Sequence, residues 1–158
     1  MASDRARLAR DDAPALLSFY NGVSAATKRT FRPLGEATSL EVCQRIVGES
    51  VRPSSARIDF VCSLQGQIVG WAFIVPLAED HPDLGVCVTD EFQGRGLGTA
   101  LLSQVLEAAR LRRLSPIYLL VVKDNQRALR WYERNGFSVY ADSYDEGDQL
   151  HYFHMRRS

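Results

Sequence analysis

The sequence has no excess of charge of either sign, because its 19 Lys and Arg residues balance its 19 Asp and Glu residues. Proteins that bind nucleic acid through its phosphates ordinarily present a basic surface, and this balance supplies no overall field of that kind. Arg110, Arg112 and Arg113 lie close together, and we interpret them as solvated cations at a helix end. The charge pattern therefore predicts no nucleic-acid partner.

Long apolar runs are also missing from the sequence. No apolar stretch reaches the roughly 20 residues that cross a membrane, and no apolar signal-peptide segment opens the chain. We therefore expect no membrane partner and a cytoplasmic location. Hydrophobic residues make up 46% of the 158 residues, which is enough for one sizeable core, so we expect a single domain over residues 1–158.

Cysteine and histidine are scarce and widely spaced. They are Cys43, Cys62, Cys87, His81, His151 and His154. An odd number of cysteines without a Cys-x-x-Cys pair is atypical of a disulfide framework or a zinc site. His151 and His154 are an odd number of positions apart on a predicted strand, so they face opposite sides and cannot easily share a metal. We predict no metal site and interpret all three histidines, including His81 in its turn-rich stretch, as structural or surface residues.

The most informative segment spans residues 83–99, where an apolar strand leads through a glycine-rich turn into an amphipathic helix. Gly94, Gly96 and Gly98 stand at alternate positions, so backbone N–H groups can approach a ligand without an intervening Cβ. The first turn of the helix adds unpaired N–H groups and the positive end of the helix dipole. This arrangement predicts a pyrophosphate site in which Arg95 neutralises charge rather than pointing to solvent.

Two common phosphate-binding motifs do not fit this spacing. A Walker loop requires Gly-x-x-x-x-Gly-Lys-Ser/Thr, but Thr99 follows Gly98 directly, without a lysine. The dinucleotide motif Gly-x-Gly-x-x-Gly also fails, because the third glycine comes one residue early and no βαβ pattern opens the chain. The spacing therefore argues against a nucleoside triphosphatase and a dinucleotide-binding domain.

Two signatures in the chain together resemble one known family. The segment Gln93-Gly94-Arg95-Gly96-Leu97-Gly98 resembles the Gln/Arg-x-x-Gly-x-Gly/Ala segment of the GCN5-related N-acetyltransferases. Residues 125–137 read Asn-x-x-Ala-x-x-x-Tyr-x-x-x-Gly-Phe and are similar to that family's second signature, with Asn125 suited to an N-cap and Gly136 to the helix stop. The resemblance covers residues 57–156, the predicted cofactor-binding core, while the first fifty residues match only in their pattern of elements.

Periodicity and this resemblance together predict an α/β (α+β) fold, with a mixed, mostly antiparallel sheet of about six to seven strands flanked by about four helices. Strands are expected at 5–10, 57–64, 68–75, 84–88, 117–122, 137–141 and 150–155, and helices at 11–22, 38–48, 96–113 and 125–135. Thr38 and Glu41 form a capping box for the second helix. Residues 23–37 are interpreted either as part of an acceptor groove or as an ordinary surface loop.

The resemblance implies acetyl-coenzyme A as the cosubstrate, with its pantetheine arm in a gap where strands 84–88 and 117–122 splay apart. A backbone N–H of the 86–88 stretch would stabilise the oxyanion formed when an amine attacks the thioester. The cofactor-binding residues expected on this basis are Val86, Cys87, Val88, Gln93, Gly94, Arg95, Gly96, Leu97, Gly98, Thr99, Asn125, Ala128 and Tyr132. Asn125 would hydrogen-bond the cofactor arm, cap its helix, or do both. For Cys87, a buried strand residue is favoured over a nucleophile, because no histidine is placed to activate it.

Two residues are predicted to be catalytic. Tyr132 is suited to protonate the departing thiolate, because a phenol pKa near 10 and a thiol pKa near 8.5 make that transfer feasible; the alternative is a ring packed in a helix–sheet interface. Asp83 stands where many family members carry a glutamate general base, and it would act directly or through a bridging water. Because aspartate is shorter by a methylene and follows Pro82, a plain turn residue is the alternative.

The sequence thus predicts an acetyl-CoA-dependent N-acetyltransferase that acts on a primary amine of a small molecule or a protein, such as a lysine or an N-terminus. The amine would attack the thioester directly in a ternary complex. Two alternatives are a non-catalytic acyl-CoA-binding regulatory module and a relative that uses a longer acyl chain. A homodimer is kept open as the assembly.

Overall fold

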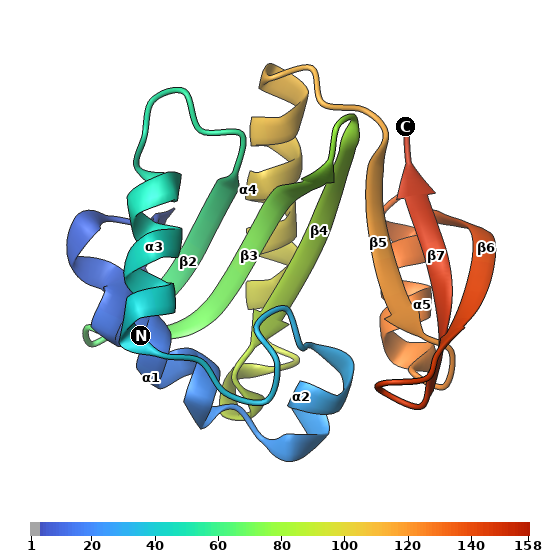
Figure 1. Ribbon diagram of the computed structural model, residues 1–158, viewed down its shortest axis with the longest axis horizontal. Helices are drawn as coiled ribbons and strands as arrows, with labels where there is room; N and C mark the ends of the chain where they lie inside the picture. Colours follow the sequence, from blue (N-terminus) through green and yellow to red (C-terminus); the bar gives the residue numbers. More distant parts are fainter. Residues whose placement is uncertain (1–3) are drawn as a thin grey trace.

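The computed structural model describes residues 4–158, so residues 1–3 of the predicted domain lie outside the described part. Its strands form one sheet in the order β1-β2-β3-β4-β5-β7-β6, as Figure 1 shows. The strands are β1 (Asp4–Arg7), β2 (Ile58–Leu64), β3 (Gln67–Ala78), β4 (His81–Val88), β5 (Ile117–Val122), β6 (Ser138–Asp145) and β7 (Leu150–Arg157). Every neighbouring pair is antiparallel except β4 and β5. The mixed, mostly antiparallel sheet of six to seven strands is therefore confirmed.

Helices cover both faces of this sheet. They are α1 (Ala13–Gly22), α2 (Ala25–Thr30), α3 (Leu40–Ser50), α4 (Leu97–Leu111) and α5 (Gln126–Arg134), with single 3-10 turns η1 (Arg10–Asp12) and η2 (Asp90–Phe92). In the view of Figure 1, α3 lies in front of the sheet and α4 lies behind it. In residues 4–158, no helix is both long and apolar enough to cross a membrane.

Two hydrophobic clusters, one on each face, hold the helices to the sheet. Ala72 and Ile74 of β3 belong to the cluster under α4, whereas Trp71 and Phe73 belong to the cluster under α1 and α3. Successive side chains of a strand point to opposite faces, so an unbroken apolar strand contributes to both. The central position of β3 follows directly from its continuous apolar sequence.

The first fifty residues depart most from the predicted elements. Residues 23–37 contain the short helix α2, whose N-cap Ser24 accepts a hydrogen bond from the Thr27 N–H at 3.2 Å. A helix of six residues shows too little periodicity to be recognised. The cap of α3 is Ser39 rather than Thr38, and it accepts from the Val42 N–H at 3.3 Å. The predicted strand 5–10 ends at Arg7, because a 3-10 turn begins at residue 10.

Strands β4 and β5 meet at one point and then diverge. Their register contains a single pair, Asp83 with Tyr118, although both strands continue for several residues. Figure 1 shows β5 leaving β4 towards the end of the sheet where α4 begins. The splay implied by the resemblance is therefore confirmed. We call the space between the two strands beyond this pair the β4–β5 gap.

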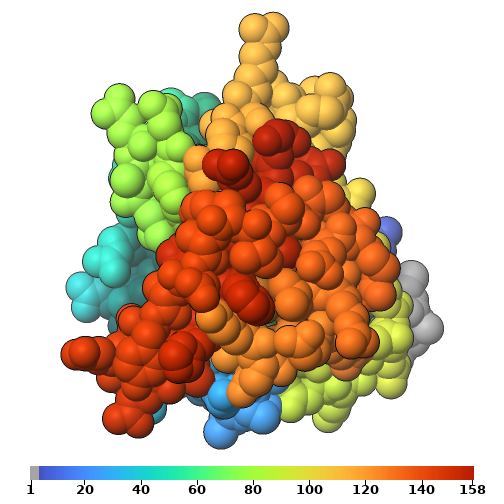
Figure 2. Space-filling model, turned by 90° about the vertical axis from the view of Figure 1, so that its right-hand side faces the viewer, coloured from blue at the N-terminus to red at the C-terminus, as the bar shows by residue number. Residues whose placement is uncertain are grey.

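The sheet ends at β6, which pairs with β7 on one side only. All eight residues of β6 are exposed, including the large side chains of Val139, Tyr140 and Tyr144. Figure 2 shows this end of the molecule, where β6 and α5 lie side by side at the surface.

Candidate active site

The glycine-rich turn after β4 has the backbone geometry that its sequence predicts. Gly94 and Gly96 have φ values of 77° and 84°, in the left-handed region that favours glycine. Gly96 is the N-cap of α4, which begins at Leu97, and a Cβ at Gly96 would meet no atom within 4 Å. The first intrahelical bond comes from the Ala100 N–H to the Gly96 carbonyl, so the N–H groups before it are free for a ligand. This is the geometry of an anion site.

Side chains of the turn brace it against the rest of the protein. The Gln93 side-chain amide donates to the Val88 carbonyl at 2.9 Å and so ties the turn to the end of β4. The Trp131 indole N–H donates to the Thr99 hydroxyl at 3.1 Å, which joins the first turn of α4 to α5. Gln93 and Thr99 are therefore held by protein partners, and the backbone of the turn is what faces outward.

Two guanidinium groups lie at this turn. Arg95 is exposed and its guanidinium lies 5.2 Å from the centre of the Phe92 ring; no carboxylate between residues 4 and 158 pairs with it. Arg127, at the start of α5, places a guanidinium nitrogen 3.6 Å from where a Cβ of Gly94 would stand. Sequence reasoning missed Arg127, although it lies inside the second signature between Asn125 and Ala128. Two cations beside unpaired N–H groups fit a pyrophosphate.

The backbone of Val86, Cys87 and Val88 borders the β4–β5 gap. These residues pair with Ala72, Trp71 and Gly70 of β3 on one side, and their register contains no β5 partner on the other. Every second N–H and carbonyl of the stretch therefore points towards the gap without a strand partner. Half-buried backbone groups need hydrogen-bond partners, so this edge fits the extended amide arm of coenzyme A.

The thiol of Cys87 is not suited to nucleophilic chemistry. Its side chain is buried on β4, and desolvation, together with the nearby charge of Asp90, raises the pKa of Cys87 to about 12. A thiol with that pKa is protonated at neutral pH, whereas the thiolate is the nucleophile. The interpretation of Cys87 as a buried strand residue agrees with this geometry.

The second signature forms the start of α5 as predicted. The Asn125 side chain accepts from the Ala128 N–H at 3.3 Å, so it caps the helix, and Ala128 packs against the core under α4. Gly136 follows the helix with a φ of 90°, and a Cβ there would come within 3.0 Å of the Arg157 side chain. The cap role kept open for Asn125 is therefore confirmed, and its hydrogen bond to the cofactor arm stays a prediction.

Tyr132 lies in the core between α5 and the sheet. It is 8% exposed, with its ring 4.9 Å from Trp131 and 5.7 Å from Phe137. Burial raises the pKa of the Tyr132 phenol far above its ordinary range, and the nearby Cys87 adds to the effect. The hydroxyl is therefore protonated at every physiological pH, and the same shift makes it a weaker acid towards a departing thiolate than an exposed phenol would be.

Asp83 lies within β4, opposite Tyr118 of β5, so its interpretation as a plain turn residue is wrong. The predicted strand started only at residue 84, because Pro82 suggested a turn. The Asp83 carboxylate lies 2.6 Å from Nδ1 of His81, and its side chain is 16% exposed. Desolvation raises the pKa of Asp83, and the hydrogen bond and charge of His81 oppose that shift.

His81 lies beside Asp83 and is a candidate site residue that sequence reasoning missed. It is the first residue of β4, and its ring stacks on Tyr118 with 3.9 Å between ring centres and 9° between ring planes. The spacing His-x-Asp puts both side chains on one face of a strand, and this signal could have found the pair. Among residues 4–158, no group of three or more His, Cys, Asp or Glu side chains is placed to hold a metal ion.

Five residues of the 23–37 segment line a cavity, and their role in an acceptor groove stays a prediction. The cavity measures about 440 Å³ and lies between the α2 region and the hairpin that joins β6 to β7; it is lined by Ala25, Lys28, Arg29, Arg32, Glu36, Asp148 and Leu150. Arg32 reaches Asp148 at 3.6 Å, and Arg29 forms two hydrogen bonds with Asp124 at 3.0 and 2.7 Å. These contacts join the α2 region to the β5 side of the gap.

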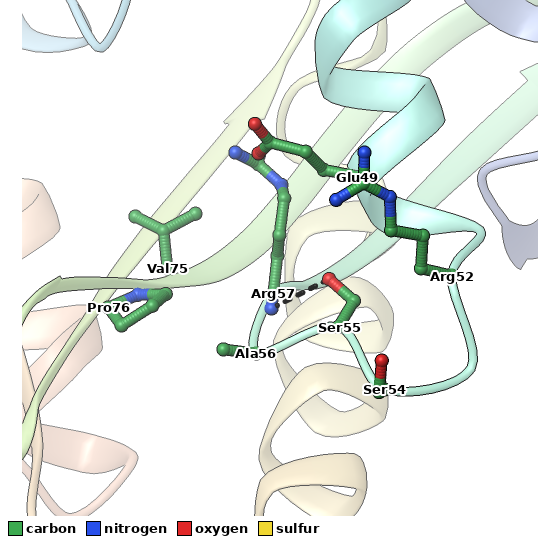
Figure 3. A pocket seen from close by; sticks show the side chains of 8 residues that line it. All are labelled: Glu49, Arg52, Ser54, Ser55, Ala56, Arg57, Val75 and Pro76. Carbon is green, nitrogen blue, oxygen red and sulfur yellow. Dashed lines mark hydrogen bonds between the residues drawn. The ribbon is translucent and has the colours of Figure 1, made fainter.

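A second cavity of about 360 Å³ lies beside the end of α3, and the arginine in its lining has a structural role. Figure 3 shows its lining, in which the Arg57 side chain extends towards Glu49. The Arg57 guanidinium binds both oxygens of Asp59 at 2.8 and 2.9 Å, and the fully buried Asp59 also accepts from the Trp71 indole N–H at 3.0 Å. Arg57 therefore balances a buried carboxylate of the core and is not part of the candidate site.

Comparison with known proteins gives the class. The model of the Acetyltransferase (GNAT) family matches residues 27–137, which is more than half of the chain. This chain therefore belongs to the GNAT acetyltransferase family. Enzymes of that family use acetyl-CoA.

Several relatives are similar to parts of the chain. Mycothiol acetyltransferase from Rhodococcus jostii is 32% identical over 121 residues, which are 73% of this chain and 40% of that protein. Spermidine N(1)-acetyltransferase from Escherichia coli is 29% identical over 97 residues, or 60% of this chain and 49% of that protein. The chain thus spans less than half the length of these curated relatives.

Solved structures agree in fold over nearly the whole chain. An acetyltransferase of the GNAT family from Streptococcus pneumoniae matches with a TM-score of 0.84 at 23% identity, covering 99% of both chains. YncA of Salmonella typhimurium, a putative acetyltransferase solved with its cofactor acetyl-CoA, matches with a TM-score of 0.81 at 19% identity, covering 99% of this chain and 93% of that one. At these identities the likeness concerns the fold, and it confirms the predicted fold class.

Proposed function

We propose that this chain is an acetyl-CoA-dependent N-acetyltransferase that transfers an acetyl group to a primary amine by direct attack in a ternary complex. The observation that carries the proposal is the β4–β5 gap, which opens a strand edge next to a glycine-rich helix N-terminus. Membership of the GNAT family supports the same activity. The acceptor class remains a primary amine of a small molecule or a protein.

The chain offers a continuous binding surface for the cosubstrate along β4. The N–H groups around Gly96, with Arg95 and Arg127 beside them, would hold the pyrophosphate. The free edge of Val86–Val88 would hydrogen-bond the pantetheine amides. When bound there, acetyl-CoA supplies a thioester whose carbonyl carbon accepts the amine.

Three groups of the chain serve the transfer in this proposal. A backbone N–H of Val86–Val88 donates to the carbonyl oxygen as negative charge develops on it. Tyr132, which burial keeps protonated, gives its proton to the sulfur as negative charge develops there. Asp83 assists removal of a proton from the acceptor ammonium, whose pKa near 10 keeps it charged at neutral pH.

The test is release of free thiol from acetyl-CoA in the presence of a panel of amines. Spermidine, L-amino acids and a peptide with an N-terminal alanine suit the panel, because proteins similar in sequence or fold carry these substrates in their names. Acetylated product is identified by mass spectrometry. Binding of coenzyme A without thiol release would favour the regulatory module, and faster release from longer thioesters would favour a different acyl donor.

A further inference from the structure

A pair of side chains at the narrow end of the β4–β5 gap is not explained by packing alone. The Nδ1 of His81 lies 2.6 Å from the Asp83 carboxylate, which accepts a hydrogen bond from it, and the His81 ring lies flat on Tyr118. The carboxylate fixes the direction of the ring and the stack fixes its plane. The imidazole is therefore held at two points, by the carboxylate and by the Tyr118 ring.

The two members of this pair differ in exposure. The His81 side chain is 41% exposed, whereas that of Asp83 is 16% exposed. An amine arriving from solvent therefore meets the imidazole before the carboxylate. A carboxylate at Nδ1 favours the tautomer with the proton on Nδ1, which leaves the Nε2 lone pair free to accept a proton.

A second imidazole on the sheet provides a contrast. His154 of β7 contacts Ser143 through Nε2 at 2.7 Å, and its ring lies 6.0 Å from Tyr140. Its Nε2 is therefore engaged, whereas none of the hydrogen bonds found in residues 4–158 engages Nε2 of His81. The other groups that face this region are Tyr118 of β5, Tyr140 of β6 and Arg156 of β7, whose guanidinium lies 5.0 Å from the Tyr140 ring.

The pair also lies on the line that the cosubstrate would follow. The glycine-rich turn is at one end of β4 and the Asp83–Tyr118 contact closes the gap at the other, with Val86–Val88 between them. A strand rises about 3.3 Å per residue, so Val86 lies about 10 Å along the strand from Asp83 and about 16 Å from His81, whose ring contacts the Asp83 carboxylate. The acceptor nitrogen would lie between these two points, and its proton would reach the imidazole through bridging water.

We propose that His81 accepts the proton of the acceptor ammonium, with Asp83 as the positioning residue that orients the imidazole; this rests on the proposed N-acetyltransferase function. One N–H proton moves to Nε2, and the imidazolium later releases it to solvent. The freed amine forms a bond to the acetyl carbon as the carbon–sulfur bond breaks. The sulfur takes a proton from Tyr132, and the second proton of the nitrogen restores the phenol.

A spectroscopic experiment tests the pair without any acceptor. In protein labelled with ¹⁵N-histidine at pH 8, long-range ¹H–¹⁵N correlation spectra should show His81 with its proton on Nδ1 and a bare Nε2. Asp83→Asn should abolish this preference, while His154 keeps its own signals. A His81 proton on Nε2 in the wild type would overturn the proposal.

Kinetics with any amine that the wild type acetylates provide the second test. His81→Gln should lower kcat at pH 7 by about 100-fold with little change in KM for acetyl-CoA, and adding Asp83→Asn should cause almost no further loss, because residues that act as a unit are not additive. His151→Gln, whose ring lies against Tyr144, is the matched control, with a change of less than about threefold. Wild-type turnover of His81→Gln, or losses that multiply in the double variant, would contradict the assignment. If the wild type acetylates no amine, that result counts against the proposed function. The ¹H–¹⁵N spectra would then still show whether Asp83 holds the His81 proton on Nδ1.

Discussion

The two ends of β4 differ in how they are built. At its carboxyl end, the strand enters a turn whose functional atoms belong to consecutive residues, with left-handed φ values at Gly94 and Gly96. At its amino end, Asp83 gains its environment from Tyr118 on a neighbouring strand and from the stacked ring of His81. A site made of local backbone is visible in a sequence, whereas a site made by strand pairing is not.

The two ends also differ in electrostatics. The carboxyl end is positive, because Arg95, Arg127 and the N-terminus of α4 lie together. The amino end holds the Asp83 carboxylate. Desolvation raises its pKa, and the hydrogen bond and charge of His81 act in the opposite direction. The first environment suits an anionic ligand, and the second suits proton transfer. Substitutions at each end should therefore affect different measurements.

The largest effect is expected for Gly96→Glu, which places a side chain at a φ of 84° and a negative charge at the anion site. The affinity for coenzyme A should fall by about 100-fold or more in calorimetry. Coenzyme A at a hundred times its wild-type Kd should stabilise the wild type by about 2.7 kcal/mol, and the same concentration should stabilise the variant by no more than about 0.4 kcal/mol. Gly48→Glu, at an open position in α3, is the control for added charge. If Gly96→Glu binds coenzyme A as tightly as Gly48→Glu does, coenzyme A does not bind at this turn.

The next largest effect is expected for Tyr132→Phe, which keeps the buried ring and removes the hydroxyl. Turnover should fall by about 100-fold if proton transfer to the sulfur limits the reaction, while affinity for acetyl-CoA stays close to that of the wild type. Single-turnover kinetics measure the chemical step. A variant with wild-type rate would assign Tyr132 to packing against Trp131 and Phe137.

A smaller, pH-dependent effect is expected for Asp83→Asn. At pH 7 nearly all of the amine is protonated, so loss of assistance should lower the rate by about tenfold. The ratio of wild-type to variant rate should shrink as the pH rises towards the pKa of the amine near 10, because free amine becomes abundant. Rates across pH with saturating acceptor measure this ratio. A large ratio that stays constant would indicate a purely positional or electrostatic role.

The smallest functional effect is expected between the two ends, for Gly85→Ala. A Cβ at Gly85 would lie 2.3 Å from the Phe73 ring, so the ring must shift. Overpacking of this kind costs about 1–3 kcal/mol in the free energy of unfolding, which urea denaturation would measure. Gly48→Ala, with open space around its Cβ, should cause no comparable loss. Affinity for coenzyme A should change little, and a large loss of binding would show that the two ends are coupled through β4.

Sequence reasoning was most successful where function and structure share consecutive residues. The turn at Gly94–Gly98, the cap at Asn125 and the stop at Gly136 are found as predicted, because each depends on a local dihedral angle or a hydrogen bond across three or four residues. The helix α2 was missed because six residues carry little periodicity. The start of β4 was placed too late because Pro82 suggested a turn, although proline is compatible with the first residues of a strand.

The sequence by itself therefore predicted the family, the mixed sheet and the glycine-rich turn, because the two signatures, the glycine spacing and the apolar periodicity act through local backbone geometry. Only the tertiary structure decided that β4 and β5 meet at Asp83 and Tyr118, that Arg127 reaches Gly94, and that His81 is fixed between a carboxylate and a ring. These contacts join residues from different elements, and the packing of the sheet rather than any local preference brings them within reach of one another.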